Sequence, residues 1–316
     1  MWASIYPGQG SQHSGMGKFL WENFRPAKEV FEEASEAIKL DLRRLCFEAP
    51  DSELALTHNT QPALLTVSVA SFRVLESLVA YRPIAGAGHS IGEYAALVAA
   101  GSLDFSDAVK AVRQRGLFMQ SAVPLGEGAM LALLGLGNEQ VEELCLWVKK
   151  QSGYDNLDAA NFNSPSQVVV SGSRQAIEWL QKNYSEAAFS HEKPRRVKLI
   201  PLKVSAPFHC AMMKPAEIQM RKVLEEIEFL DSSYPIVQNF TAEPSQKAKM
   251  LCENLIYQIS APVRWVECVE KIGQMGGKRM IELGSGKVLA GLVKKIDSTN
   301  FEVFGMNDLE DIRHLE

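Results

Sequence analysis

The pentapeptide Gly88-His89-Ser90-Ile91-Gly92 fits the pattern Gly-x-Ser-x-Gly, which places a nucleophilic serine on a sharp elbow between a strand and a helix. Residues 82–87 before it are typical of a short strand, and residues 94–100 after it are typical of an apolar helix that ends at Gly101. A serine on so sharp a turn has a strained backbone, and the two glycines leave it the necessary room. An ordinary buried turn built from small residues is the alternative.

The composition is that of a globular protein. The chain has 316 residues, of which 46% are hydrophobic and 22% charged, enough for one large domain or two smaller ones. Its formal net charge of -5 argues against general nucleic-acid affinity. The first residues have neither a basic start nor a long apolar run, so we expect no signal peptide and no membrane span. Five cysteines without a Cys-x-x-Cys pair are typical of reduced thiols rather than a disulfide or zinc site, and we expect a cytoplasmic protein.

The hydrophobic periodicity divides the chain into two parts. Between 127 and 201 the predicted order is strand-helix-strand-strand-helix-strand, the arrangement of a ferredoxin-like unit. The sequence therefore predicts an α/β fold, with a hydrolase-like parallel-sheet core made of residues 1–126 and 202–316 and an inserted ferredoxin-like (α+β) subdomain made of residues 127–201. Strands are predicted at 2–6, 82–87, 130–136, 157–161, 167–171, 196–201, 236–239 and 279–283. Helices are predicted up to about residue 80, with breaks at Pro26, at 50–52 and at 59–62, and then at 94–100, 106–123, 139–150, 174–183, 215–229 and 288–295.

A serine hydroxyl needs a base within hydrogen-bond reach before it can act as a nucleophile. The candidates are six histidines: His13, His58, His89, His191, His209 and His314. His209 stands in an apolar segment and follows Ser90 in the chain, the order that α/β-hydrolases use. His89 is adjacent to Ser90, and neighbouring side chains on an elbow diverge. A structural role for His209, and a catalytic role for His13 or His58, stay open on these grounds.

Arg115 stands on an otherwise apolar face of the helix predicted at 106–123. The residues that share this face are Ala108, Val112, Phe118, Met119 and Ala122. Burying a guanidinium without a partner is strongly disfavoured. Arg115 therefore either pairs with a carboxylate of the protein or awaits the carboxylate of a ligand, which it would hold by a two-pronged hydrogen bond.

Two glycine clusters are close to nucleotide-binding motifs but do not match them. Residues 86–92 are one residue out of register for a dinucleotide fingerprint. Residues 284–287 lack both the upstream glycine and the following Ser or Thr of a Walker A loop. The sequence therefore predicts no nucleotide cofactor.

Taken together, the motifs resemble those of malonyl-CoA:acyl-carrier-protein transacylases, the stand-alone acyltransferases of dissociated fatty-acid synthesis. The similarity covers nearly the whole chain and keeps the motifs in order. It is carried by residues 7–12, 60–63, 88–93, 113–116, 119–120, 161–165, 167–172, 207–209, 258, 262–265 and 282–284. One departure is Gly284-Ser285-Gly286, where the family often has Gly-Pro-Gly, and it affects only a turn.

The resemblance implies a role for each residue of the site. Ser90 is the expected nucleophile, His209 the general base and then the general acid, and the backbone carbonyl of Gln258 the group that orients the imidazole. The expected oxyanion hole is formed by the backbone N–H groups of Gln9 and Ile91. The expected substrate residues are Arg115 as a clamp for the malonyl carboxylate, Asn161 in the pocket, and Phe208, which malonyl-selective members tend to carry.

The resemblance also implies a reaction and its partners. A malonyl group would pass from malonyl-CoA to the phosphopantetheine thiol of acyl carrier protein through an ester on Ser90, without a cofactor or metal on the chain, and with a monomer as the working unit. Because carrier proteins are mostly acidic, an acidic chain needs a local basic surface. The candidates are Lys193, Arg195, Arg196, Lys198, Lys287, Lys294 and Lys295.

Three other functions stay open at this point. A trans-acting acyltransferase that loads a polyketide synthase would use the same chemistry with another partner. A serine esterase would have an acidic third triad member and no need for a buried Arg115. A degenerate domain kept for assembly is disfavoured because Ser90, His209 and Arg115 are all present.

Overall fold

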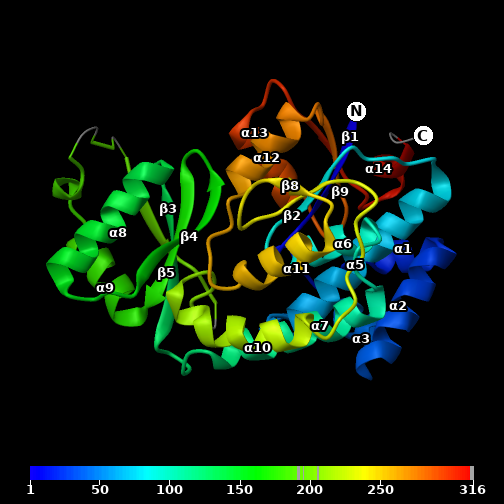
Figure 1. Ribbon diagram of the computed structural model, residues 1–316, viewed down its shortest axis with the longest axis horizontal. Helices are drawn as coiled ribbons and strands as arrows, with labels where there is room; N and C mark the ends of the chain where they lie inside the picture. Colours follow the sequence, from blue (N-terminus) through cyan, green and yellow to red (C-terminus); the bar gives the residue numbers. More distant parts are fainter. Residues whose placement is uncertain (191–192, 195, 205, 314–316) are drawn as a thin grey trace.

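The structure is a computed structural model that describes residues 1–190, 193–194, 196–204 and 206–313. The described residues form two sheets, each with its own helices (Figure 1). The chain enters the small sheet after the first half of the large part and returns from it, so the smaller unit is an insertion, as predicted. The fold class is the α/β arrangement expected from the sequence.

The large sheet has the strand order β10-β9-β1-β2-β7-β8. All its neighbouring strands are parallel except β8, which runs antiparallel to β7. Its strands are β1 (Trp2–Tyr6), β2 (Gly86–Gly88), β7 (Ile236–Val237), β8 (Pro244–Ser245), β9 (Arg279–Glu282) and β10 (Glu302–Phe304). Since β1, β2 and β7 are parallel, the residues that follow them meet at one edge of the sheet, where open α/β sheets bind ligands.

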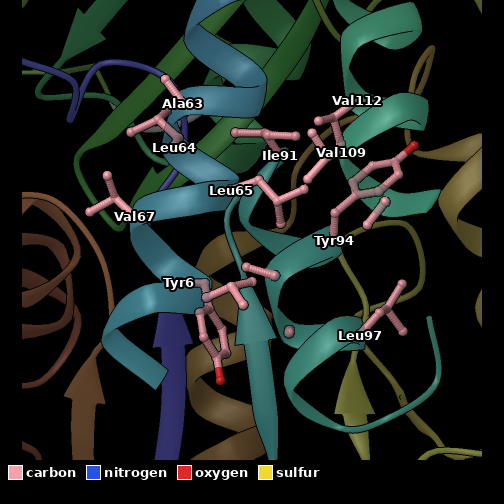
Figure 2. Close-up of a cluster of buried hydrophobic side chains, with 14 of the residues drawn as sticks. Tyr6, Ala63, Leu64, Leu65, Val67, Ile91, Tyr94, Leu97, Val109 and Val112 are labelled. Carbon is pink, nitrogen blue, oxygen red and sulfur yellow. The ribbon is translucent and has the colours of Figure 1, made fainter. Parts of the chain in front are cut away.

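Helices cover both faces of this sheet because successive strand residues point to opposite sides. Tyr6 belongs to the buried cluster that includes Leu65, Ile91 and Val109 (Figure 2), whereas Ile5 belongs to a second buried cluster. The helices of the large part are α1 (Lys18–Asn23), α2 (Arg25–Ile38), α3 (Leu42–Phe47), α4 (Asp51–Leu54), α5 (Thr57–Leu78), α6 (Gly92–Ala99), α7 (Phe105–Ser121), η2 (Ala211–Met213), α10 (Lys214–Leu224), α11 (Ala248–Tyr257), α12 (Trp265–Gln274), α13 (Val288–Ile296) and α14 (Leu309–Arg313).

The small sheet is antiparallel, with the strand order β4-β5-β3-β6. This order, with a helix after the first and third strands, is that of a ferredoxin-like unit. Its elements are β3 (Gly128–Leu134), α8 (Asn138–Ser152), β4 (Leu157–Ser164), β5 (Gln167–Ser173), α9 (Arg174–Asn183), η1 (Glu186–Ala188) and β6 (Lys198–Pro201). The sheet and its helices enclose a separate cluster of buried side chains.

Three sequence-based expectations are wrong. The predicted break at 59–62 is absent: α5 runs through Pro62, whose ring cannot donate to the carbonyl of His58. That carbonyl accepts a hydrogen bond of 2.6 Å from the Arg113 guanidinium instead, so the His58 oxygen still has a partner. The strand predicted at 82–87 is confined to β2, and the helix predicted at 215–229 ends at Leu224.

Candidate active site

The elbow between β2 and α6 has the strained geometry that the pentapeptide predicts. Ser90 has φ of 53°, a left-handed conformation that is uncommon for residues other than glycine. A Cβ on Gly88 would lie 1.9 Å from the carbonyl carbon of Gly92, and a Cβ on Gly92 would lie 2.1 Å from the Tyr6 oxygen. Only glycine therefore fits at positions 88 and 92.

Ser90 and His209 form a hydrogen-bonded pair in the folded chain. Ser90 Oγ lies 2.7 Å from His209 Nε2, and His209 Nδ1 lies 2.9 Å from the carbonyl oxygen of Gln258. A carbonyl can only accept, so Nδ1 carries the ring proton and Nε2 is the acceptor for the serine hydroxyl. Burial, together with the positive charge of Arg115, lowers the pKa of His209 to about 3, so the ring is a neutral base at pH 7.

Arg115 lies beside this pair on α7, with only 1% of its surface exposed. Its terminal nitrogen donates to Ser90 Oγ at 3.2 Å and to Gln258 Oε1 at 2.9 Å. Its Nε has no hydrogen-bond partner, and no ion pair within the described residues includes Arg115. The sequence left open whether Arg115 pairs with a carboxylate of the protein or awaits the carboxylate of a ligand. The structure shows no direct pairing with a carboxylate of the described residues.

The pair opens into a cavity of about 150 Å³. Its walls are formed by Gln9, Gln61, His89, Ser90, Arg115, Met119, Met130, Asn161, Asn163, Val169, Leu202, Val204, Phe208 and His209. The structure thus brings Gln9, Asn161 and Phe208 into one cavity with Ser90. The cavity has room for a short acyl chain next to the Arg115 guanidinium.

Two backbone N–H groups near Ser90 are available to a ligand. Those of Gln9 and Ile91 have no hydrogen-bond partner among the described residues. The turn of Gln9 is packed tightly on the elbow, since a Cβ on Gly8 would lie 2.5 Å from the carbonyl oxygen of His89. The side chain of Ile91 points into the core (Figure 2), so only its backbone faces the site.

Sequence reasoning missed the polar residues that support the elbow. Asn239 Oδ1 accepts a hydrogen bond of 2.7 Å from the backbone N–H of Ser90, and its Nδ2 donates to the Gly88 carbonyl at 2.7 Å. Glu93 accepts from the backbone N–H of Asn239 at 2.7 Å. A signal for Asn239 existed: it follows β7, whose carboxyl end meets that of β2.

Among the described residues, the other histidine side chains form no hydrogen bond with the Ser90 hydroxyl. His89 Nε2 lies 2.8 Å from Asn163 Oδ1, and its ring packs against Trp265. His13 is exposed, and His58 is half-buried at the start of α5. His191, His314 and Arg195 lie outside the described residues. In that described part, no group of three or more metal-ligating side chains occurs, and no helix is long and apolar enough to cross a membrane.

The elbow serine, its histidine and the buried arginine on this fold define an α/β acyl-transfer protein. The family model for the acyl transferase domain matches residues 3–300. A malonyl CoA-acyl carrier protein transacylase of Bacillus subtilis is 43% identical over 312 residues, covering 98% of this chain and 94% of that protein. The corresponding protein of Escherichia coli K12 is 40% identical over 297 residues, covering 94% of this chain and 93% of that protein.

Solved structures agree with the sequence relatives. An acyl carrier protein S-malonyltransferase from Vibrio cholerae is 40% identical and superimposes with a TM-score of 0.92, covering 100% of this chain and 99% of that one. A complex of a type II PKS acyl-carrier protein with its malonyl-transacylase matches at 40% identity and a TM-score of 0.91, covering 99% of this chain and 98% of that one. The chain belongs to the malonyl CoA-acyl carrier protein transacylase family.

Proposed function

We propose that this chain transfers the malonyl group of malonyl-CoA to the phosphopantetheine thiol of an acyl carrier protein, and so supplies fatty-acid elongation. The observation that carries the proposal is the unpaired Arg115 guanidinium next to the Ser90–His209 pair. A buried cation within hydrogen-bonding distance of the nucleophile favours an acyl group that contains a carboxylate. Malonyl thioesters have that carboxylate, and acetyl thioesters do not.

The reaction would proceed in two half-reactions through one ester. Ser90 Oγ attacks the thioester carbonyl and gives its proton to His209 Nε2, while the N–H groups of Gln9 and Ile91 stabilise the oxyanion. The coenzyme A sulfur leaves with that proton, and the malonyl group stays on Ser90. The carrier thiol then gives its proton to His209 and attacks the ester, and the serine hydroxyl is restored. The carbonyl of Gln258 holds the imidazole throughout.

Two residues of the cavity wall are proposed to fit the acyl chain. Phe208 and Asn161 are 7% exposed and line the same cavity as Ser90 and Arg115. Phe208 limits the width of the cavity, which favours an unbranched malonyl chain over methylmalonyl. Asn161 offers an amide to the polar end of the substrate.

The esterase alternative is not favoured by the contacts of His209. An esterase triad holds its histidine through a carboxylate, whereas His209 Nδ1 donates to a backbone carbonyl. Loading a polyketide synthase carrier is the second candidate function, because one structural relative is a complex with a type II PKS acyl-carrier protein. Both candidates use the same chemistry, so they differ in the carrier alone.

We propose further that the enzyme works as a monomer in the cytoplasm and carries no metal or cofactor. All five cysteines are free, which supports a reducing compartment. Activity should survive exhaustive dialysis against EDTA, and light scattering should report the mass of one chain. Loss of activity that a metal restores would contradict this part of the proposal.

The function is tested by intact-protein mass spectrometry after mixing the enzyme with malonyl-CoA in the absence of carrier. A malonyl adduct should form on the wild type, be absent from Ser90→Ala, and be weak with acetyl-CoA. Adding a fatty-acid or a polyketide carrier to the isolated adduct then shows which one accepts the group. No adduct on a folded wild type would overturn the proposal.

A further inference from the structure

Glu93 is a buried carboxylate with no part in the reaction described above. It lies in the first turn of α6, three residues after Ser90, and is fully buried. Its Oε1 accepts a hydrogen bond from Gln238 Nε2 at 3.1 Å. Its Oε2 accepts from the backbone N–H of Asn239 at 2.7 Å and from Gln258 Nε2 at 3.0 Å. Burial raises the pKa of Glu93 to about 6 and these hydrogen bonds oppose the rise, so the group is ionised at pH 7.

The side-chain amide of Gln258 connects this carboxylate to Arg115. Its Nε2 donates to Glu93 and, at 3.0 Å, to the carbonyl of Ser90. Its Oε1 accepts from the terminal nitrogen of Arg115 at 2.9 Å. Guanidinium, amide and carboxylate therefore form one continuous chain of hydrogen bonds beneath the nucleophile.

This chain fixes which way the Gln258 amide points. Exchanging its oxygen and nitrogen would place an NH2 group against the Arg115 guanidinium and an oxygen against two acceptors, Glu93 and the Ser90 carbonyl. The Gln258 amide is therefore oriented with its Oε1 as the acceptor for the Arg115 guanidinium. Because the negative charge of Glu93 is separated from the guanidinium by one amide, it offsets the positive charge without forming an ion pair, and Arg115 Nε has no partner among the described residues.

Resting on the proposed function, we propose that Glu93 is a positioning residue that acts through the Gln258 amide to hold the Arg115 guanidinium at Ser90, and that it thereby sets the preference for acyl groups ending in a carboxylate. A direct ion pair between Glu93 and Arg115 would occupy the guanidinium and compete with the substrate. Separation by one amide keeps the cation in place and leaves its donors for the ligand.

The test compares Glu93→Gln with wild type and with Glu282→Gln. Glu282 is also a buried carboxylate that accepts hydrogen bonds, but it does so from the backbone of α13 and lies outside the cavity wall. Three quantities are measured: the rate of malonyl-adduct formation against malonyl-CoA concentration, the same for acetyl-CoA, and the rate of labelling by a serine-directed phosphonate that has no carboxylate. The phosphonate reports on Ser90 and His209 without requiring Arg115.

Glu93→Gln should lower the ratio of malonyl to acetyl acylation at least about tenfold, chiefly through a higher half-saturating malonyl-CoA concentration. Phosphonate labelling should fall less than about threefold, and Glu282→Gln should keep the wild-type ratio. If Glu93→Gln does not fold, Gln258→Met breaks the same chain of hydrogen bonds while keeping the backbone carbonyl that His209 needs. It should show the same loss of preference.

An unchanged malonyl-to-acetyl ratio in a folded variant would overturn this inference alone. So would a parallel fall of phosphonate labelling and malonyl acylation, because it would mean that Glu93 supports the elbow rather than Arg115. A wild type that reacts with the phosphonate but takes no malonyl group would instead overturn the proposed function, and this inference with it.

Discussion

The positive charge of Arg115 lies next to both Ser90 and His209. The guanidinium stands 3.2 Å from Ser90 Oγ and helps to lower the pKa of His209. On the proposed function, we expect a substrate carboxylate that pairs with Arg115 to offset this charge and make the imidazole a stronger base while the malonyl group is bound. Substrate recognition and base strength would then be coupled through Arg115.

The lowered pKa of His209 predicts how the free enzyme responds to pH. The ring should stay neutral well below its ordinary value of 6.5, so labelling of Ser90 by the phosphonate should remain nearly constant from pH 8 to pH 5.5. The stability of the fold, by contrast, should depend on pH. Below pH 6.5 the imidazole of the unfolded chain binds a proton and that of the folded chain does not, so the free energy of unfolding falls as the pH is lowered. A labelling rate that drops with a midpoint near 6.5 would show that the imidazole is not held in this way.

Replacing Arg115 by alanine tests the selection directly. Arg115→Ala should lower kcat/KM for malonyl-CoA by about 10²–10³-fold, the range expected when a buried charged hydrogen bond is lost. Acylation from acetyl-CoA should not decrease, since that substrate has no carboxylate for the guanidinium. Steady-state kinetics with both thioesters give the answer, and an unchanged preference would remove Arg115 from substrate recognition.

At the scale of elements, the elbow depends on close backbone contact between β1, β2 and α6. Gly92→Ala should lower the free energy of unfolding by about 3 kcal/mol, because the new Cβ would meet the Tyr6 oxygen at 2.1 Å and the backbone has to move. Gly291→Ala is a matched control, since its Cβ meets nothing within 4 Å and alanine favours α13 by about 0.5–1 kcal/mol. Urea denaturation of both variants checks the contrast, and equal effects would contradict it.

Helices and strands with a strong local hydrophobic pattern could be predicted from the sequence. Those whose bounds depend on contacts with residues far along the chain could not. The elbow, α7 and the ferredoxin-like unit have clear periodicity, and their predicted positions agree with the structure to within a few residues. The continuation of α5 through Pro62 depends on Arg113, which lies 55 residues beyond His58. The edge strands β8 and β10 have two and three residues, too few to show a pattern.

The residues of the site, like the elements, could be predicted only in part from local sequence patterns. Ser90, His209, Arg115 and Gln258 come from four separate segments. The motif, the chain order and the helical periodicity singled out the first three, but only the family resemblance assigned them to one site and added Gln258. Glu93 directly follows the elbow pentapeptide, but the role proposed for it depends on the orientation of the Gln258 amide, which no sequence pattern encodes. Contacts of this kind become visible only when the folded chain places them side by side.

At the scale of the whole molecule, the chain carries a formal net charge of -5, so docking of an acidic carrier, which the family resemblance leads us to expect, needs a local basic surface. α13 contacts β4 and so joins the two sheets (Figure 1), and Lys295 bonds to Gln167 of β5. The turn before α13 packs on the loop of Gln9, since a Cβ on Gly284 would lie 2.7 Å from Pro7. Lys287, at the N-cap of α13, and the two lysines of α13 thus lie on a helix that extends from the turn beside the Gln9 loop to the small sheet. Lys287 forms an ion pair of 3.3 Å with Asp311.

If this helix receives the carrier, the double variant Lys287→Glu/Lys294→Glu should raise the KM for carrier protein about tenfold and leave malonyl-adduct formation from malonyl-CoA unchanged. Wild-type KM should also rise with salt, more steeply than in the variant, because screening removes an attraction that the variant has already lost. The control is Lys222→Glu/Lys249→Glu, which changes two exposed lysines of α10 and α11 and lowers the net charge equally, by 2 × 2 = 4. Equal effects in the two double variants would mean that the carrier responds to overall charge, and that docking does not involve α13. An effect confined to the α13 variant would place the carrier-docking surface on α13.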